Sequence, residues 1–180
     1  GKGYTVDLYE SKSDILSATS AINQYRIHRG YHYPRSKETI VSCRDNEKEF
    51  RTFYAGAIID NVDHYYSIAS NDSLTTPKEY LHVLDQCDLE WMIVDTMPGC
   101  DLTIRAKESL FCPETLKIIC EERLYGCNVN VLLNNKVENI KDLKEYKYTV
   151  VATYSTLNTF DTKEKDYQYE LCEKPAFKLP

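Results

Sequence analysis

Residues 5–10 are the feature that most constrains what this chain can fold into. They read TVDLYE, an alternating pattern with β-branched and aromatic residues that is typical of a β-strand. Gly3 lies just before them, and glycine often ends a helix because it adopts the left-handed conformation without strain. The order helix end, turn, strand predicts the second half of a βαβ unit. Glu10 places a carboxylate at the end of this strand.

Helices and strands are predicted to interleave along the rest of the chain. Residues 36–54 carry apolar side chains at helical spacing behind a serine N-cap. A Thr-Pro-Lys-Glu sequence starts a second helix at 76–87, and a third is expected at 113–126. This order predicts the α/β class with an antiparallel component. Further strands are expected at residues 64–69, 91–94, 129–133, 136–140, 148–153 and 167–172.

Composition excludes several classes of function. The net charge of −6 argues against a nucleic-acid partner, which would need a basic face. No apolar run reaches the length of a membrane span, and no signal-peptide pattern opens the chain. The seven cysteines are irregularly spaced and include no C-x-x-C, so neither a metal site nor a disulfide framework is expected. Reduced thiols indicate a cytoplasmic protein.

Residues 20–36 have an unusual composition for a surface loop. They contain three Arg, two His, three Tyr, one Asn and one Gln, but neither Asp nor Glu. Such a segment suits an anionic or electron-rich ligand, for example a phosphate, a carboxylate or a reduced flavin ring. An ordinary basic surface loop is the alternative interpretation.

This region resembles the segment that follows the ribose-binding Glu in FAD-dependent oxidoreductases of the D-amino-acid-oxidase type. Ala18-Thr19-Ser20 is similar to the Ser/Thr-rich turn of that family. Arg26-Ile27-His28-Arg29 is similar to its R-I-x-R pattern, and residues 28–33 to its H-x-G-x-x-Y pattern. Downstream, 113–124 resembles the family's P-x-x-L helix, and 148–154 its V-V-x-A-T-G strand, with Tyr154 in place of the glycine.

The resemblance implies a partial Rossmann-like FAD-binding fold of the glutathione-reductase type with an inserted antiparallel or mixed substrate lobe. The family's G-x-G-x-x-G motif would precede residue 1, so the chain is expected to be a fragment that neither retains FAD tightly nor is active alone. The implied ranges are 1–63 for FAD binding, 64–104 for a substrate-covering insertion, 105–160 for further FAD binding and 161–180 for the start of a substrate-domain sheet.

The resemblance also implies roles for individual residues. Glu10 would bind the adenosine ribose, and Arg26 and His28 would face the isoalloxazine, where positive charge stabilises the reduced ring. Arg29 would hold a substrate carboxylate through its two-pronged guanidinium. No metal is implied. The remaining implied cofactor contacts are Ser20, Asn23, Gln24, Val137, Ala152 and Thr153.

The implied reaction is oxidation of a C–N or C–O bond next to a carboxylate in a small amino-acid or hydroxy-acid type substrate, with hydride transfer to FAD. Two alternatives stay open: a flavin-fold protein of another class, such as a sugar-nucleotide mutase or a non-catalytic binding module, and an acidic interaction domain without a cofactor. Residues 20–36 argue against the interaction domain, because they hold several cations without counter-charges in the segment. Neither the substrate nor the oligomeric state follows from the sequence.

Overall fold

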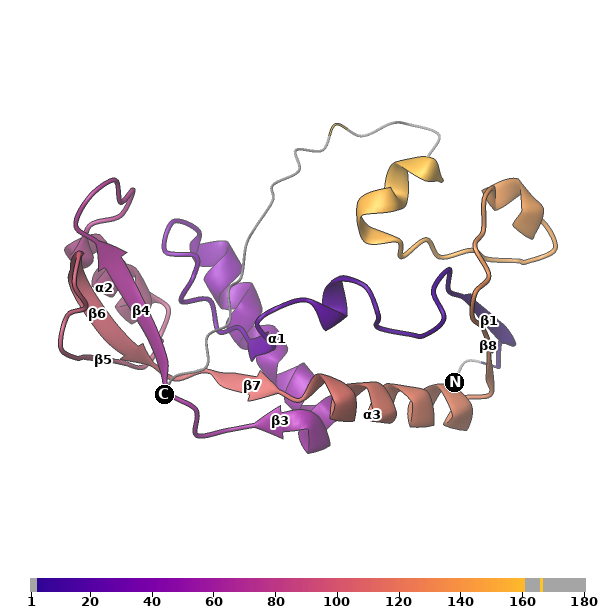
Figure 1. The fold of residues 1–180 in the computed structure, drawn as a ribbon, viewed down its shortest axis with the longest axis horizontal. Coiled ribbons are helices and arrows are strands. Elements are labelled where there is room, and N and C mark those ends of the chain that lie inside the picture. The colour runs from indigo at the N-terminus through magenta and orange to yellow at the C-terminus, as the bar shows by residue number, and fades with distance from the viewer. Residues whose placement is uncertain (1–2, 161–165, 167–180) are drawn as a thin grey trace. The chain divides into compact units, whose positions relative to one another are not determined.

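The structure, a computed structural model, describes residues 3–160 and residue 166 (Figure 1). The chain forms two compact units. Unit 1 contains residues 1–23 and 121–180, and unit 2 contains residues 24–120. Both mix helical turns with small sheets, so the predicted α/β class is confirmed. The strand predicted at 167–172 lies outside the described residues.

Unit 1 is organised around a pair of parallel strands. β1 (Val6–Tyr9) lies beside β8 (Val129–Leu132), in a register that runs from Val6 opposite Val129 to Tyr9 opposite Leu132. The helix α3 (Pro113–Gly126), whose residues divide between the units, ends shortly before β8. The strands predicted at 5–10 and 129–133 are therefore confirmed. Three short 3-10 helices complete the described part of this unit: η1 (Thr19–Ala21), η3 (Ile140–Leu143) and η4 (Tyr154–Thr159).

Two strands predicted for unit 1 do not form. Residues 136–139 are irregular and Ile140 begins η3, whereas residues 148–153 have no regular structure. Val150 in the second segment is 88% exposed, although a run of β-branched residues predicted a buried strand there. Such a run becomes a strand only where a neighbouring strand supplies hydrogen bonds. Among the described residues of unit 1, the only paired strands are β1 and β8.

Unit 2 begins with a small antiparallel sheet and a long helix. β7 (Ser109–Phe111) lies between β2 (Arg26–Ile27) and β3 (Ile58–Ile59). The helix α1 (Lys37–Tyr54) starts where the Ser36 hydroxyl accepts a hydrogen bond from the backbone N–H of Thr39, as the N-cap prediction required. The short η2 (Ala55–Ala57) joins α1 to β3.

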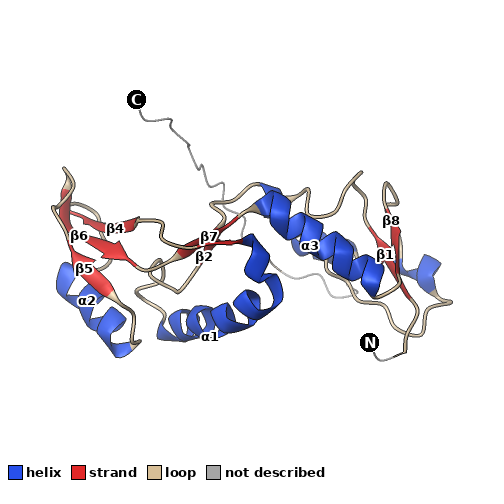
Figure 2. Ribbon diagram, turned by 90° about the horizontal axis from the view of Figure 1, so that it is seen from below, coloured by secondary structure: helices blue, strands red, loops and turns tan. Residues whose placement is uncertain are grey.

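The second sheet of unit 2 has the order β4-β6-β5 and is antiparallel throughout. Its strands are β4 (His64–Ala69), β5 (Trp91–Ile93) and β6 (Cys100–Ala106). The helix α2 (Pro77–Gln86) runs along one side of this sheet (Figure 2). Its first turn contains the predicted capping box. The Thr76 N–H donates to the Glu79 carboxylate, and the Glu79 N–H donates to the Thr76 hydroxyl.

The buried core belongs to unit 2. Tyr31 and Ile40 pack there against the side chains of α2 and of the β4-β6-β5 sheet. The Tyr80 hydroxyl donates a hydrogen bond of 2.9 Å to the carbonyl of Tyr31, which satisfies a polar group inside the core. No residue of unit 1 is fully buried in the part of the chain that the structure describes. None of the helices found among the described residues is both long and apolar enough for a membrane span.

Candidate functional site

Glu10 stands at the carboxyl end of β1, one residue beyond the parallel pairing with β8. Its backbone continues the ladder, because its N–H donates to the Leu132 carbonyl at 3.0 Å. The carboxylate oxygen Oε1 accepts hydrogen bonds from the Lys12 N–H at 2.8 Å and from the Ser11 hydroxyl at 3.2 Å. Within the described residues, Oε2 has no hydrogen-bond partner. One carboxylate oxygen is thus anchored by the turn, and the other can accept a ligand's hydroxyl.

The other polar residues predicted to contact a cofactor near Glu10 in sequence have local roles. Ser20 is exposed and lies in η1, where its carbonyl accepts a hydrogen bond of 2.9 Å from the Asn23 side-chain amide. Gln24 belongs to unit 2, and its Oε1 accepts a hydrogen bond of 2.7 Å from Arg26. The amides of Asn23 and Gln24 therefore brace the backbone and an arginine, respectively.

The remaining predicted cofactor residues lie in irregular parts of unit 1. Val137 is half-buried in the segment before η3. Ala152 and Thr153 are exposed, and Thr153 caps η4 through its carbonyl. The strand that was predicted to return Ala152 and Thr153 to a cofactor is the one that does not form.

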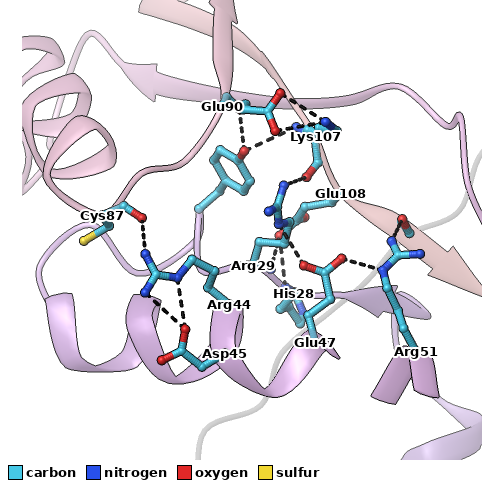
Figure 3. Close-up of polar contacts among 12 residues, drawn as sticks. His28, Arg29, Arg44, Asp45, Glu47, Arg51, Cys87, Glu90, Lys107 and Glu108 are labelled. Carbon is cyan, nitrogen blue, oxygen red and sulfur yellow. Dashed lines mark hydrogen bonds and ion pairs between the residues drawn. The ribbon is translucent and has the colours of Figure 1, made fainter. Parts of the chain in front are cut away.

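Arg26, His28 and Arg29 meet around one buried carboxylate, Glu108, which lies between β6 and β7. The backbone N–H of Arg29 donates to Glu108 Oε1 at 2.8 Å. His28 Nδ1 lies 4.0 Å from the same oxygen, and Arg26 Nη1 lies 3.7 Å from Oε2. Figure 3 shows His28 and Arg29 beside Glu108. The structure therefore brings together all three residues that were predicted to be catalytic.

The argument that the cations of residues 20–36 lack counter-charges is wrong. Glu108 is the counter-charge of Arg26 and His28, and Glu47 of α1 pairs with Arg29 at 2.8 Å. These carboxylates are far from the segment in sequence and reach it only through tertiary packing. The composition of residues 20–36 consequently does not by itself exclude an interaction domain.

Arg29 also belongs to a wider ion-pair network on α1. Glu47 Oε1 accepts a hydrogen bond of 2.8 Å from Arg51 Nε, and Glu47 Oε2 forms an ion pair with Arg29 Nε at 2.8 Å (Figure 3). Arg51 binds both carboxylate oxygens of Asp60, and this contact, with a hydrogen bond from Ser109, holds the pKa of Asp60 below its usual value. An open cavity of about 320 Å³ borders the network. Its lining residues are Arg29, Arg44, Asp45, Glu47, Lys48 and Arg51.

Two further residues, both of β4, border the group formed by Arg26, His28, Arg29 and Glu108 (the Glu108 cluster). The Tyr66 hydroxyl donates to Glu108 Oε2 at 2.6 Å, and burial raises the pKa of Tyr66 far above its ordinary value. His64 is 9% exposed, and its Nε2 is buried without a hydrogen-bond partner among the described residues. Burial lowers the pKa of His64 below 6.5, and the charge of Arg26 acts in the same direction, whereas Glu108 and Asp63 oppose it. At pH 7 the His64 side chain is therefore neutral in the folded protein.

A neutral buried histidine makes stability depend on pH. Unfolded His64 takes up a proton as the pH falls below 6.5, but folded His64 does so only at a lower pH. The unfolded state binds more protons in this window, so we expect the free energy of unfolding to fall as the pH drops from 7 to 5. Denaturant titrations of the wild type and of His64→Gln at several pH values test this, because the substitution should flatten the dependence. His82→Gln, at an exposed position of α2, is the control and should leave the slope unchanged.

Sequence reasoning missed Glu108 and Glu47 as partners of the arginines. Glu47 is one of many charged residues on α1, and nothing in its local pattern separates it from the others. Glu108 carried a usable signal, since it is the only acid between residues 102 and 113, at the junction of β6 and β7. Among the described residues, no group of three or more His, Cys, Asp or Glu side chains is placed to bind a metal ion.

Comparison with known proteins gives partial matches to fungal enzymes. The chain is 35% identical over 78 residues to kojA of Aspergillus flavus, a match that covers 43% of this chain and 18% of the relative. The protein from Aspergillus oryzae with the name probable FAD-dependent monooxygenase kojA gives the same values. FPY4 of Fusarium mangiferae is 29% identical over 82 residues, 46% of this chain and 22% of the relative. All three names describe FAD-dependent monooxygenases.

The matched stretch spans about a fifth of the length of these relatives. No family model matches the chain, and no solved structure matches it. The similarity supports an FAD-dependent oxidoreductase in general terms, without singling out the D-amino-acid-oxidase type.

Proposed function

We propose that this chain is part of an FAD-dependent oxidoreductase that acts on a small molecule. The observation that carries the proposal is Glu10, an acid at the carboxyl end of a strand in a parallel pair. The following turn holds one of its carboxylate oxygens, and the other has no hydrogen-bond partner among the described residues. Acids in this position of dinucleotide-binding folds accept hydrogen bonds from the ribose hydroxyls. The names of the fungal relatives support the same cofactor.

Each unit, taken by itself, offers residues for which a contact with FAD is proposed. In unit 1, Glu10 Oε2 would accept the ribose hydroxyls, and Ser20, Asn23, Val137, Ala152 and Thr153 are the further proposed contacts. In unit 2, Arg26 and His28 would place positive charge at the flavin, with Gln24 bracing Arg26 through its 2.7 Å hydrogen bond. FAD, when bound, would supply the acceptor for the electrons of the substrate.

Arg29 is the proposed ligand for a substrate carboxylate. Its guanidinium already pairs with Glu47 and donates to the Lys107 carbonyl at 3.4 Å. Binding a substrate carboxylate would therefore exchange one carboxylate partner for another, which keeps the charge of Arg29 compensated throughout. The proposed reaction is oxidation of a C–N or C–O bond next to that carboxylate, with hydride transfer to FAD.

Substitution of Glu10 in the full-length protein tests the cofactor assignment. We expect Glu10→Gln to weaken FAD binding at least about tenfold, because hydrogen bonds to a charged acceptor contribute about 1.5–3 kcal/mol. Isothermal titration with FAD measures the loss. Glu145→Gln is the matched control, since it removes the same charge at an exposed position of the same unit, and it should bind FAD like the wild type. Equal affinities for Glu10→Gln and the wild type would contradict the proposal.

A flavin-fold protein of another class, such as a sugar-nucleotide mutase or a non-catalytic binding module, is the second candidate, because it can share the Glu10 contact. The two candidates differ in net redox change. An oxidoreductase of the proposed type bleaches its flavin when a small amino acid or hydroxy acid is added without oxygen, whereas a mutase or a binding module does not. Persistent oxidised flavin across a panel of such acids would favour the second candidate.

A further inference from the structure

Glu108 is the carboxylate at the centre of the Glu108 cluster, and it is deeply buried. Its side chain is 0% exposed, and it lies between β6 and β7, where both strands belong to unit 2. Transfer of a carboxylate out of water costs several kcal/mol unless the charge is paired and hydrogen-bonded. Glu108 must therefore form strong hydrogen bonds or ion pairs. The residues that form them are the ones that this buried charge holds in place.

Those partners all belong to β4 or to the segment of residues 26–29. Oε1 accepts the Arg29 N–H at 2.8 Å and lies 4.0 Å from His28 Nδ1. Oε2 accepts the Tyr66 hydroxyl at 2.6 Å and lies 3.7 Å from Arg26 Nη1. One carboxylate thus holds the backbone of the segment at Arg29 and faces the side chains of Arg26 and His28.

Tyr66 connects Arg26 to this carboxylate. Arg26 Nη1 donates a hydrogen bond of 2.8 Å to the Tyr66 hydroxyl, and that hydroxyl in turn donates a hydrogen bond to Glu108. The guanidinium carbon lies 5.2 Å from the centre of the Tyr66 ring, a cation–π distance. On the other side, Nη2 donates to Gln24. The Arg26 guanidinium is therefore held from several directions, and its side chain is only 15% exposed.

We propose that Glu108 is a positioning residue, which acts through Tyr66 and the backbone of Arg29 to orient Arg26 and His28 and to set how much positive charge they present to the flavin. The inference rests on the proposed function. A charge without solvent around it acts strongly on neighbours within a few ångströms. Removal of the Glu108 charge would leave Arg26 less compensated, so the flavin would experience a more positive environment.

The reduction potential of FAD in the full-length holoprotein tests this inference without any substrate. Positive charge favours the anionic reduced ring, so we expect Glu108→Gln to raise the potential and Arg26→Gln to lower it. Glutamine can still accept the Arg29 N–H, which preserves the segment. Glu108→Asp keeps the charge and should return the potential toward the wild-type value. Glu47→Gln is the control, because it removes the same charge from a partner of Arg29 that pairs with neither Arg26 nor His28.

The outcomes separate the two proposals. If Arg26→Gln lowers the potential but Glu108→Gln leaves it at the wild-type value, Glu108 has no positioning role and the inference is overturned. A rise of equal size in Glu47→Gln would also overturn it, since the effect would then be that of any nearby charge. Failure of the full-length wild-type protein to bind FAD would instead overturn the proposed function, and the inference with it.

Tyr66→Phe keeps the proposal testable if Glu108→Gln does not fold. Phenylalanine retains the ring but loses the hydroxyl that joins Arg26 to Glu108. Without this tether the guanidinium can turn away, so we expect the potential to shift in the same direction as in Arg26→Gln, but by less. A Tyr66→Phe holoprotein with the potential of the wild type would overturn the inference.

Discussion

Gly30→Ala is expected to lower the free energy of unfolding by about 3 kcal/mol, as the sum of a backbone and a packing effect. Gly30 has a φ of +102°, a conformation that L-residues rarely adopt. A Cβ at this position would also lie 2.6 Å from the Cα of Ile40 in α1. That contact is with backbone, so it cannot be relieved by rotating a side chain. Denaturant unfolding of the two proteins measures the difference.

Gly99→Ala separates the two causes. Gly99 also has a positive φ, +78°, but a Cβ there would meet nothing within 4 Å. We expect this control to lose only the backbone part, about 1 kcal/mol. If Gly30→Ala costs no more than Gly99→Ala, the close packing of the segment against α1 is not what makes glycine necessary. The glycine of the H-x-G-x-x-Y pattern would then need another explanation.

Ile104→Ala is expected to cost about 2–5 kcal/mol of stability, the usual range for truncating a fully buried aliphatic side chain. Ile104 is 0% exposed and lies on the central strand of the β4-β6-β5 sheet, opposite Tyr66 on one side and Ile93 on the other. Its truncation would open a cavity beside the strand that carries Tyr66. Thermal or denaturant unfolding measures the loss, and Ile104→Val should show a smaller one, about 0.5–1.5 kcal/mol.

Ile93→Ala is the control for this effect. Ile93 is the cross-strand neighbour of Ile104 but is 55% exposed. The residue type and the sheet are the same, so a difference between the variants reports burial alone. We expect Ile93→Ala to cost less than about 1 kcal/mol, since little of its surface leaves water on folding. Similar losses for both variants would show that Ile104 does not anchor the core.

The elements that the sequence predicts correctly are those with local causes. The helix α2 needs only Thr76, Pro77 and Glu79 to define its start, and α1 needs Ser36 and an apolar stripe. The strand predicted at residues 148–153 does not form, because a strand needs a neighbouring strand to pair with, and local composition does not reveal one. The central strand β6 was not predicted, although its residues, CDLTIRA, alternate apolar and polar side chains as those of a half-buried strand do. The Rossmann-like fold of the whole domain stays a prediction.

The candidate site divides in the same way. Glu10 was predicted from a strand followed by an acid, and the structure places it at the carboxyl end of β1. Arg26, His28 and Arg29 were grouped by their closeness in sequence, and they do lie together. Their carboxylate partners could not be predicted, because Glu47 and Glu108 reach them through tertiary packing. The predicted cofactor and catalytic roles themselves remain proposals.

The parallel pairing of β1 with β8 has a consequence for how the chain is made. The ribosome adds roughly 5–20 residues per second, and on the order of 120 residues separate the two strands, so β1 waits at least several seconds for its partner. Unit 2 is continuous and contains the buried core, so its contacts can form during that interval. Slowing translation after residue 120 should therefore lengthen the interval in which unit 2 of the nascent chain resists protease while β1 is still cleaved.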